Sequence, residues 1–238
     1  MSALLSIVMP AHNEADWLAA SVRDVAAGLR ERQQRFEIIV VENGSSDGTE
    51  AVADALAPDV PELRTLSLPN ADYGAALRHG FLAAKGDVVV NFDVDYYDLE
   101  FVDRALPLLA EPGGPALVVA TKRGAGAVDT RGAGRRLVTG VFSTVLRVGF
   151  GLRVSDTHGM KAMRVDALRP LVDRCRLGRD LFDTELIIRA ERDGQRAAEL
   201  PVVVAERRPS RSPIVRRAAR TVGGLVHLWA VLRRDRRH

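Results

Sequence analysis

The sequence predicts an α/β protein with a mostly parallel central sheet flanked by helices. Three observations support this fold class. Short β-branched segments alternate with helical segments from the start of the chain, which is the pattern of βαβ units. Polar and glycine-containing motifs follow directly after several strand-like segments. The length of 238 residues and the hydrophobic content of 47% suit one domain with a sizeable core.

The predicted elements can be justified in order along the chain. The first strand ends before Asn13, which can cap the following helix, and the second ends at a Gly/Ser/Asp turn. The turn Gly86-Asp87 precedes a valine-rich strand, and a Gly- and Arg-rich loop at 123–134 precedes the more helical second half. Strands are predicted at 4–8, 36–41, 63–68, 88–92 and 117–120. Helices are predicted at 13–30, 49–57, 73–84, 99–110, 135–150, 165–174 and 181–193.

Composition limits where the protein could act. Cys175 is the only cysteine, so no intrachain disulfide can form, which fits a reducing compartment. The apolar segment 4–9 lacks a basic region and a cleavage site, so it predicts a strand and not a signal peptide. No segment reaches the roughly 18 to 20 apolar residues of a transmembrane helix. We therefore expect a cytoplasmic protein, with peripheral attachment to the inner face of the cell membrane left open.

The C-terminal segment is basic. The net charge is only +3, but arginines gather from Arg207 onward, with Asp235 the one acid there. We predict one domain over 1–212 and a basic amphipathic helix and tail over 213–238, with Val226 and Trp229 in its apolar stripe. This helix could pack on its own domain or on an anionic membrane, and both interpretations stay open. Few aromatic residues and no zinc-ligand spacing argue against nucleic acid as a partner.

Asp93-Val94-Asp95 is the most informative motif in the chain. It follows the valine-rich strand 88–92, and ligands of open α/β sheets bind at the carboxyl ends of strands. Two carboxylates at such a place suit Mg²⁺ or Mn²⁺ that also holds a diphosphate. The alternative is a helix N-cap region with solvated acids. The motif therefore predicts Asp93 and Asp95 as metal ligands.

The first two strands also end in polar motifs. The first ends in Pro10-Ala11-His12-Asn13-Glu14, and the second in Glu42-Asn43 followed by a glycine-containing turn. Carboxylate and amide groups can hydrogen-bond a nucleotide base, and such a turn lets backbone approach a ligand. A plain strand–helix connection explains the turn equally well. The candidate nucleotide-binding residues are Pro10, Ala11, Asn13, Glu14, Glu42, Asn43, Gly44, Ser45 and Asp93.

The order and spacing of these motifs resemble family 2 glycosyltransferases of the GT-A fold, a Rossmann-like fold of nucleotide-diphospho-sugar transferases. Three later segments, 155–161, 181–186 and 199–207, resemble dolichyl- and polyprenyl-phosphate hexosyltransferases. The resemblance implies an inverting, metal-dependent transfer of a hexose from a nucleoside-diphosphate sugar to a polyprenyl phosphate. It also implies that Asp95 is the stronger metal ligand and that Asp93 lies nearer the ribose or sugar.

The resemblance implies acceptor residues as well. Arg207 matches an arginine that ends a strand in that branch, and it would guide the acceptor phosphate together with Arg123, Arg131 and Arg135. The sequence departs from the branch in the turn 209–213, which has no glycine and has Pro213 in place of a lysine. Glu42-Asn43 likewise replaces the two aspartates that usually end the second strand.

Two other functions stay open. A family member with a hydroxyl acceptor needs a general base, and Asp183 stands at about the place where such members carry one. The chain could also be a non-catalytic nucleotide-binding protein on the same fold, because fold does not determine function.

Overall fold

The computed structural model describes residues 3–121, 128–129, 133–155, 157, 159–204 and 214–234. Its centre is a seven-stranded sheet in the order β3-β2-β1-β4-β7-β5-β8. These strands are β1 (Leu5–Ala11), β2 (Phe36–Asn43), β3 (Leu63–Leu68), β4 (Val88–Asn91), β5 (Leu117–Thr121), β7 (Lys161–Arg164) and β8 (Ala197–Pro201). Two short strands, β6 (Val128–Asp129) and β9 (Val203–Val204), pair with each other outside this sheet.

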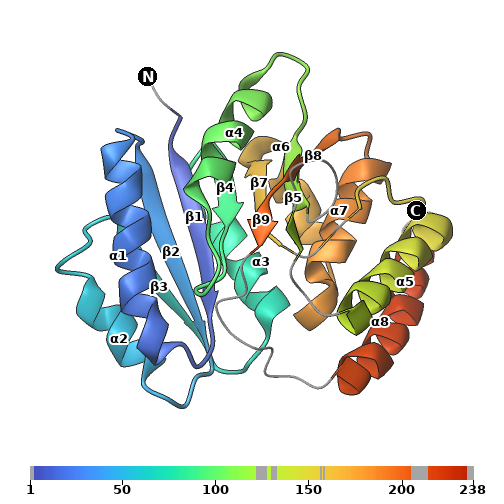
Figure 1. Ribbon diagram of the computed structural model, residues 1–238, viewed down its shortest axis with the longest axis horizontal. Helices are drawn as coiled ribbons and strands as arrows, with labels where there is room; N and C mark the ends of the chain where they lie inside the picture. Colours follow the sequence, from blue (N-terminus) through green and yellow to red (C-terminus); the bar gives the residue numbers. More distant parts are fainter. Residues whose placement is uncertain are drawn as a thin grey trace.

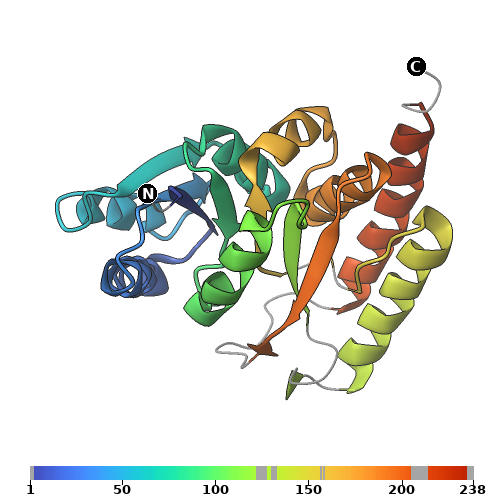
Figure 2. The same ribbon diagram turned by 90° about the horizontal axis from the view of Figure 1, so that it is seen from above.

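Helices cover both faces of the sheet (Figures 1 and 2). One face packs against α1 (Ala15–Glu31), α2 (Thr49–Leu56) and α4 (Leu99–Ala110). The other face packs against α3 (Tyr73–Ala83), α6 (Val165–Arg174) and α7 (Phe182–Arg192). Two long helices, α5 (Ala133–Phe150) and α8 (Ile214–Arg234), lie side by side at the α7 end and add to the second core. The two faces are supplied alternately by each strand: in β4, Val88 and Val90 belong to one core and Val89 to the other.

The predicted order of the elements up to β5 is confirmed, but β6, β7 and β9 were not predicted, and a strand near β8 was implied only by the resemblance of 199–207. β7 is the missed strand in the interior of the sheet. It is antiparallel to β4 and to β5, whereas the other neighbouring strands of the sheet are parallel. β7 has only four residues and begins with Lys161, whose side chain is fully buried. A short strand that opens with a charge shows neither alternation nor an apolar run, so the sequence pattern concealed it.

The cap of α1 was predicted wrongly. The N-cap residue is Glu14 and not Asn13, and no side chain of its own caps the helix. Two residues from the loop after β2 provide the acceptors instead. Thr49 Oγ1 accepts from the Glu14 amide at 2.8 Å, and Asp47 Oδ2 accepts from the Ala15 amide at 3.2 Å. The first helix therefore depends on a neighbouring loop for its start.

The buried face of α8 also differs from the predicted apolar stripe. Leu228, Val231 and Leu232 are buried against the domain, whereas Val226 is 66% exposed and Trp229 is 47% exposed. Val226 and Trp229 both belong to the predicted apolar stripe. The helix therefore packs on its domain through one face and presents part of the predicted stripe outward.

Candidate functional site

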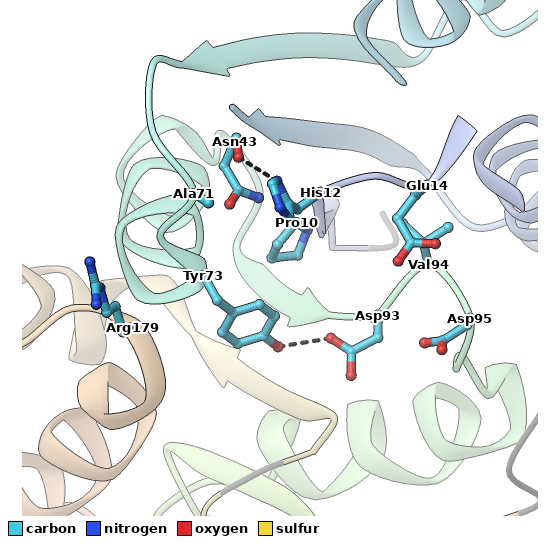
Figure 3. Close-up of a pocket in the computed structure, with 10 residues that line it drawn as sticks. All are labelled: Pro10, His12, Glu14, Asn43, Ala71, Tyr73, Asp93, Val94, Asp95 and Arg179. Carbon is cyan, nitrogen blue, oxygen red and sulfur yellow. Dashed lines mark hydrogen bonds between the residues drawn. The ribbon is translucent and has the colours of Figure 1, made fainter. Parts of the chain in front are cut away.

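A cleft of about 440 Å³ opens where β1, β2 and β4 end (Figure 3). The register brings these ends together, because Ala11 lies opposite Glu42 and Val8 lies opposite Asn91. This is the edge at which open α/β sheets bind ligands. The lining residues are Pro10, His12, Glu14, Asn43, Ala71, Tyr73, Asp93, Val94, Asp95 and Arg179. Five of them, Pro10, Glu14, Asn43, Asp93 and Asp95, were predicted.

The turn after β4 holds both aspartates at the cleft. Asp93 and Tyr96 exchange two backbone hydrogen bonds of 3.1 Å, which close the turn. Val94 between the aspartates is only 2% exposed, and its carbonyl accepts from Ser21 Oγ of α1 at 2.6 Å. Because the valine is anchored inward, the two carboxylates are presented to the cleft from a fixed backbone.

The surroundings of Asp93 disfavour its negative charge. Burial raises the pKa of its carboxyl group, and the nearby carboxylates of Asp95 and Asp183 raise it further. The Tyr73 hydroxyl donates to Asp93 Oδ1 at 2.8 Å, which together with the Lys161 charge opposes this rise in pKa. Burial, followed by the Asp93 charge, also holds the pKa of Tyr73 well above its usual value. Tyr73 thus stays a proton donor that orients Asp93.

The donor set fits a hard divalent cation. In the part of the chain that the structure describes, no three His, Cys, Asp or Glu side chains gather in a group that could hold a metal. Asp93 and Asp95 could therefore hold Mg²⁺ or Mn²⁺ only if ligand oxygens and water complete the coordination, which is the usual arrangement for Mg²⁺ beside phosphates. A cation there would also balance the charge that Asp93 shares with its acidic neighbours.

Asn43 and Glu42 make hydrogen bonds to the protein's own backbone. Asn43 Nδ2 donates to the Ala11 carbonyl at 2.9 Å, and its Oδ1 accepts from the Asp72 amide at 3.1 Å. Glu42 Oε1 accepts from the Ser45 amide at 2.5 Å. Both side chains are buried, so they join the ends of β1, β2 and α3. Their predicted contact with a nucleotide base stays a prediction.

The loops after β1 and β2 brace each other. Asn13 has a positive φ of 56°, which lets its Oδ1 accept from the Ser46 amide at 2.8 Å while its own amide donates to Ser45 Oγ at 3.0 Å. Gly44 has a φ of +66°, and a Cβ there would lie 2.9 Å from the Ala71 amide nitrogen. Only glycine fits such a close approach at positive φ. The predicted residues Asn13, Gly44 and Ser45 therefore shape this wall of the site.

A buried ion pair lies near Asp93 in the second half of the chain. Lys161 Nζ is 3.1 Å from Asp183 Oδ1, and both side chains are almost fully buried. The contact is an ion pair and not a hydrogen bond, since Asp183 Oδ1 has no hydrogen-bond partner among the described residues. Lys161 Nζ donates instead to the Gly159 carbonyl at 2.7 Å. Asp183 stands in the first turn of α7, where it was expected. Lys161 was missed as its partner, although it ends the segment 155–161 that carried the resemblance.

Some predicted acceptor residues cannot be placed. Arg123, Arg131 and Arg207 lie outside the described residues, and Arg135 lies in α5 with its side chain outside the described part. Ala11 is fully buried in the core and does not line the cleft. Tyr73, His12 and Arg179 line the cleft but were not predicted. His12 stands inside the motif 10–14, so its position after β1 could have indicated it. Nothing in the sequence singles out Tyr73 and Arg179, because they reach the cleft only through the packing of α3 and of the loop before α7.

Comparisons with known proteins agree with this geometry. The sequence model described as Glycosyl transferase family 2 matches residues 6–172. Glycosyltransferase AglD of Haloferax volcanii is 30% identical over 83% of this chain and 32% of its own length. A dolichyl-phosphate beta-glucosyltransferase of Trichomonas vaginalis is 27% identical over 84% of this chain and 65% of its own length. An undecaprenyl-phosphate 4-deoxy-4-formamido-L-arabinose transferase of Pseudomonas fluorescens is 31% identical over 85% and 58%, respectively.

The fold has solved counterparts. Glucosyl-3-phosphoglycerate synthase from Mycobacterium tuberculosis, crystallised with Mn²⁺, UDP and phosphoglyceric acid, superposes with a TM-score of 0.66 at 25% identity. The match covers 95% of this chain and 78% of that one. This chain therefore belongs to glycosyl transferase family 2, and the predicted GT-A fold is confirmed. It spans between 32% and 65% of the length of the three curated relatives named above.

Proposed function

We propose that this chain is an inverting glycosyltransferase that moves a hexose from a nucleoside-diphosphate sugar to a polyprenyl phosphate. The observation that carries the proposal is the placement of Asp93 and Asp95 at the end of β4, in one cleft with the ends of β1 and β2. Two relatives are named for transfer to dolichyl or undecaprenyl phosphate, which supports this class of acceptor.

Each half of the cleft has a part in the reaction. Asp93 and Asp95 would hold Mg²⁺ or Mn²⁺, which stabilises the negative charge of the departing nucleoside diphosphate when it is bound. Tyr73 fixes the orientation of Asp93 through its 2.8 Å hydrogen bond. The braced loops after β1 and β2 keep the nucleotide side in one geometry, so positioning contributes to the rate. The acceptor oxygen then attacks from the opposite face of the sugar and inverts the anomeric carbon.

The ion pair of Asp183 supports an acceptor that is already an anion. A hydroxyl acceptor must lose a proton to a base, whereas a phosphate oxygen needs only positioning. If Asp183 took up a proton, the buried Lys161 ammonium, 3.1 Å away, would lose its counter-charge. Leaving a buried charge unpaired is strongly unfavourable. Asp183 is therefore better suited to hold Lys161 in place than to act as a base.

The donor site is tested by Asp95→Asn. Donor binding is measured as a thermal shift with UDP-, GDP- and dTDP-sugars, each with and without Mn²⁺. We expect a metal-dependent shift with one nucleotide in the wild type, and loss of that shift with at least about a 100-fold loss of transfer in the variant. Asp54→Asn, on the exposed face of α2, is the matched control. Donor binding without metal and without transfer would instead favour a non-catalytic nucleotide-binding protein.

The acceptor class is tested by Asp183→Asn. The variant removes the carboxylate base but keeps the size of the side chain. Because the variant also leaves the buried Lys161 without its counter-charge, its stability is measured and transfer is expressed per folded protein. We then expect transfer to polyprenyl phosphate to fall by less than about tenfold, since no base is required. If the acceptor is a hydroxyl and Asp183 is its base, transfer should fall by about 10²- to 10⁴-fold. A loss of about 10²- to 10⁴-fold would favour Asp183 as a base and would contradict transfer to a lipid phosphate.

We also propose peripheral contact with an anionic membrane through α5 and α8. No helix in the described part of the chain is long and apolar enough to cross a membrane. Val148 of α5 is 84% exposed, and Val226 and Trp229 of α8 are exposed as well. The Arg233 guanidinium lies 3.8 Å from the centre of the Trp229 ring, which places a cation beside this apolar surface. Sedimentation with phosphatidylglycerol vesicles should exceed that with phosphatidylcholine vesicles, and Trp229→Ser should reduce it.

A further inference from the structure

Among the described residues of the second half of the chain, Arg179 alone lines the cleft. All the other lining residues come from positions 10–95. Arg179 lies in the short 3-10 turn directly before α7, three residues from Phe182, where that helix begins. In the view of Figure 3, Arg179 and Asp95 stand on opposite sides of Tyr73. The cleft is therefore lined by three acidic residues, Glu14, Asp93 and Asp95, on one side of Tyr73 and by Arg179 on the other.

The backbone of Arg179 is held in an unusual conformation. Its φ is 47°, in the left-handed region that residues other than glycine rarely adopt. The Arg179 amide donates to Asp72 Oδ1 at 2.6 Å, and the same oxygen caps α3 by accepting from the Ala75 amide at 2.8 Å. Strained residues persist only where their surroundings fix them, and they gather at functional sites.

Two glycines, Gly74 in α3 and Gly178 before the 3-10 turn, allow these segments to approach each other closely. A Cβ on Gly74 would lie 2.7 Å from the Arg179 amide nitrogen, and a Cβ on Gly178 would lie 2.6 Å from Asp72 Oδ2. Neither position has room for a side chain, so α3 and the loop before α7 meet at backbone distance. Asp72 in turn donates its amide to Asn43. The position of Arg179 is thus tied to the ends of both β2 and α3.

The preceding residues are fixed as well. Glu185 Oε2 accepts from the amides of Arg176 and Leu177 at 2.9 and 2.7 Å. Its other oxygen is bound by the buried Arg189 guanidinium. In contrast to its backbone, the Arg179 side chain is exposed, and no acidic side chain of the described residues pairs with its guanidinium. The backbone of Arg179 is therefore fixed at the cleft, while its side chain is exposed there.

We propose that Arg179 binds the phosphate of the acceptor. This inference rests on the proposed function and names the residue that would receive that substrate. Arg pairs with phosphate through two parallel N–H donors, which gives orientation as well as affinity. The acidic side of the cleft, with Glu14, Asp93 and Asp95, suits the cation that holds the donor diphosphate. Arg179 lies on the other side and belongs to the same segment as Asp183, so the acceptor phosphate is its ligand.

The test measures binding directly and does not depend on turnover. Farnesyl phosphate, a short isoprenyl phosphate, is titrated into the full chain in the presence of Mn²⁺ and UDP. We expect Arg179→Ala to weaken its binding by at least about tenfold, and Arg179→Lys to restore part of it. Arg176→Ala removes an exposed arginine of the same loop that does not line the cleft, and it should bind like the wild type. Binding of UDP with Mn²⁺, measured in the same variants, should not change.

The outcomes separate this inference from the proposed function. Equal binding of farnesyl phosphate by the wild type and Arg179→Ala would overturn the inference, even if the wild type transfers sugar to a polyprenyl phosphate. A loss of UDP binding in Arg179→Ala, with farnesyl phosphate unaffected, would assign Arg179 to the donor and overturn it too. Selective loss of farnesyl phosphate binding, without transfer by the wild type, would support Arg179 and contradict the proposed reaction. No binding by the wild type would overturn both.

Discussion

The two halves of the chain use polar side chains differently. In the first half, Asn13, Glu42 and Asn43 bind backbone amides and carbonyls of neighbouring loops. In the second half, charged side chains form pairs inside the core, as in Lys161 with Asp183. Glu185 and Arg189 form a second such pair, with both side chains no more than 2% exposed. In the first half, polar side chains thus fix the loops through hydrogen bonds to the backbone, and in the second half charged side chains form buried ion pairs.

This difference predicts how the stability of each half of the chain responds to substitution. A side chain that binds backbone satisfies one or two amides, and its loss costs about the free energy of those hydrogen bonds. Removal of one partner from a buried ion pair leaves a charge without compensation, which costs more. The second half should therefore be the more sensitive to single substitutions and the first half the more tolerant.

The largest expected loss of stability follows from Arg189→Met. The variant leaves the Glu185 carboxylate buried with backbone amides as its remaining partners, so the free energy of unfolding should fall by about 3–5 kcal/mol. Urea denaturation measures it. The control is Arg23→Met, which removes an exposed pair with Asp59 and should change the stability by less than about 1 kcal/mol. Similar losses in both variants would contradict the proposed difference between buried and exposed pairs.

A smaller loss is expected from Glu37→Gln in β2. Burial raises the pKa of Glu37, but hydrogen bonds from Ser6, Lys85 and Arg64 outweigh this and leave the pKa lowered. Ionised Glu37 therefore stabilises the fold above the ordinary carboxyl pKa of about 4.3, and this stability is lost as the pH falls through the lowered value. We expect a loss of about 1–3 kcal/mol at pH 7.

The pH dependence gives this prediction its control. The difference between wild type and Glu37→Gln should shrink below about pH 4, because the wild-type carboxyl group then becomes neutral as well. Unfolding free energies measured from pH 7 down to pH 3 would show it. A difference that stays constant with pH would mean that the charge of Glu37 contributes nothing.

The smallest effect is expected from Asp47→Ala in the loop after β2. Asp47 accepts from the Ala15 amide and from the Thr49 amide and hydroxyl, so it serves the starts of α1 and α2. Loss of a capping side chain typically costs about 0.5–2 kcal/mol. Asp54→Ala, exposed on α2, should leave the denaturation midpoint nearly unchanged. If both variants behave alike, the capping role of Asp47 is wrong.

The same difference explains what the sequence could predict. The succession of strands and helices in the first half and the aspartates after β4 follow from local patterns, since each motif stands directly beside the strand that positions it. Lys161 and Asp183 lie on different elements, β7 and α7, and meet only in the tertiary structure. Arg179 reaches the cleft through the close packing of Gly74, which no periodicity reveals. Residues in the loops after β1 and β2, such as Asn13 and Ser45, were predicted to bind a ligand. The same types of side chain can bind either a nucleotide base or the protein's own backbone, and the sequence does not distinguish the two.

The reversed direction of β7 has a consequence for how such a chain can diversify. β5 runs parallel to β4 and ends at Thr121, and β7 begins at Lys161 on the same edge of the sheet, because the two strands are antiparallel. The chain therefore leaves the sheet after Thr121 and returns to it at Lys161 on the edge where β4 ends. Between these points lies α5, which buries Leu146 in the second core and so is part of the fold. Because loop closure depends only weakly on length, the connections on either side of α5 can change in length without a change in the strand order. The ends of β1, β2 and β4 that line the cleft would then stay as they are.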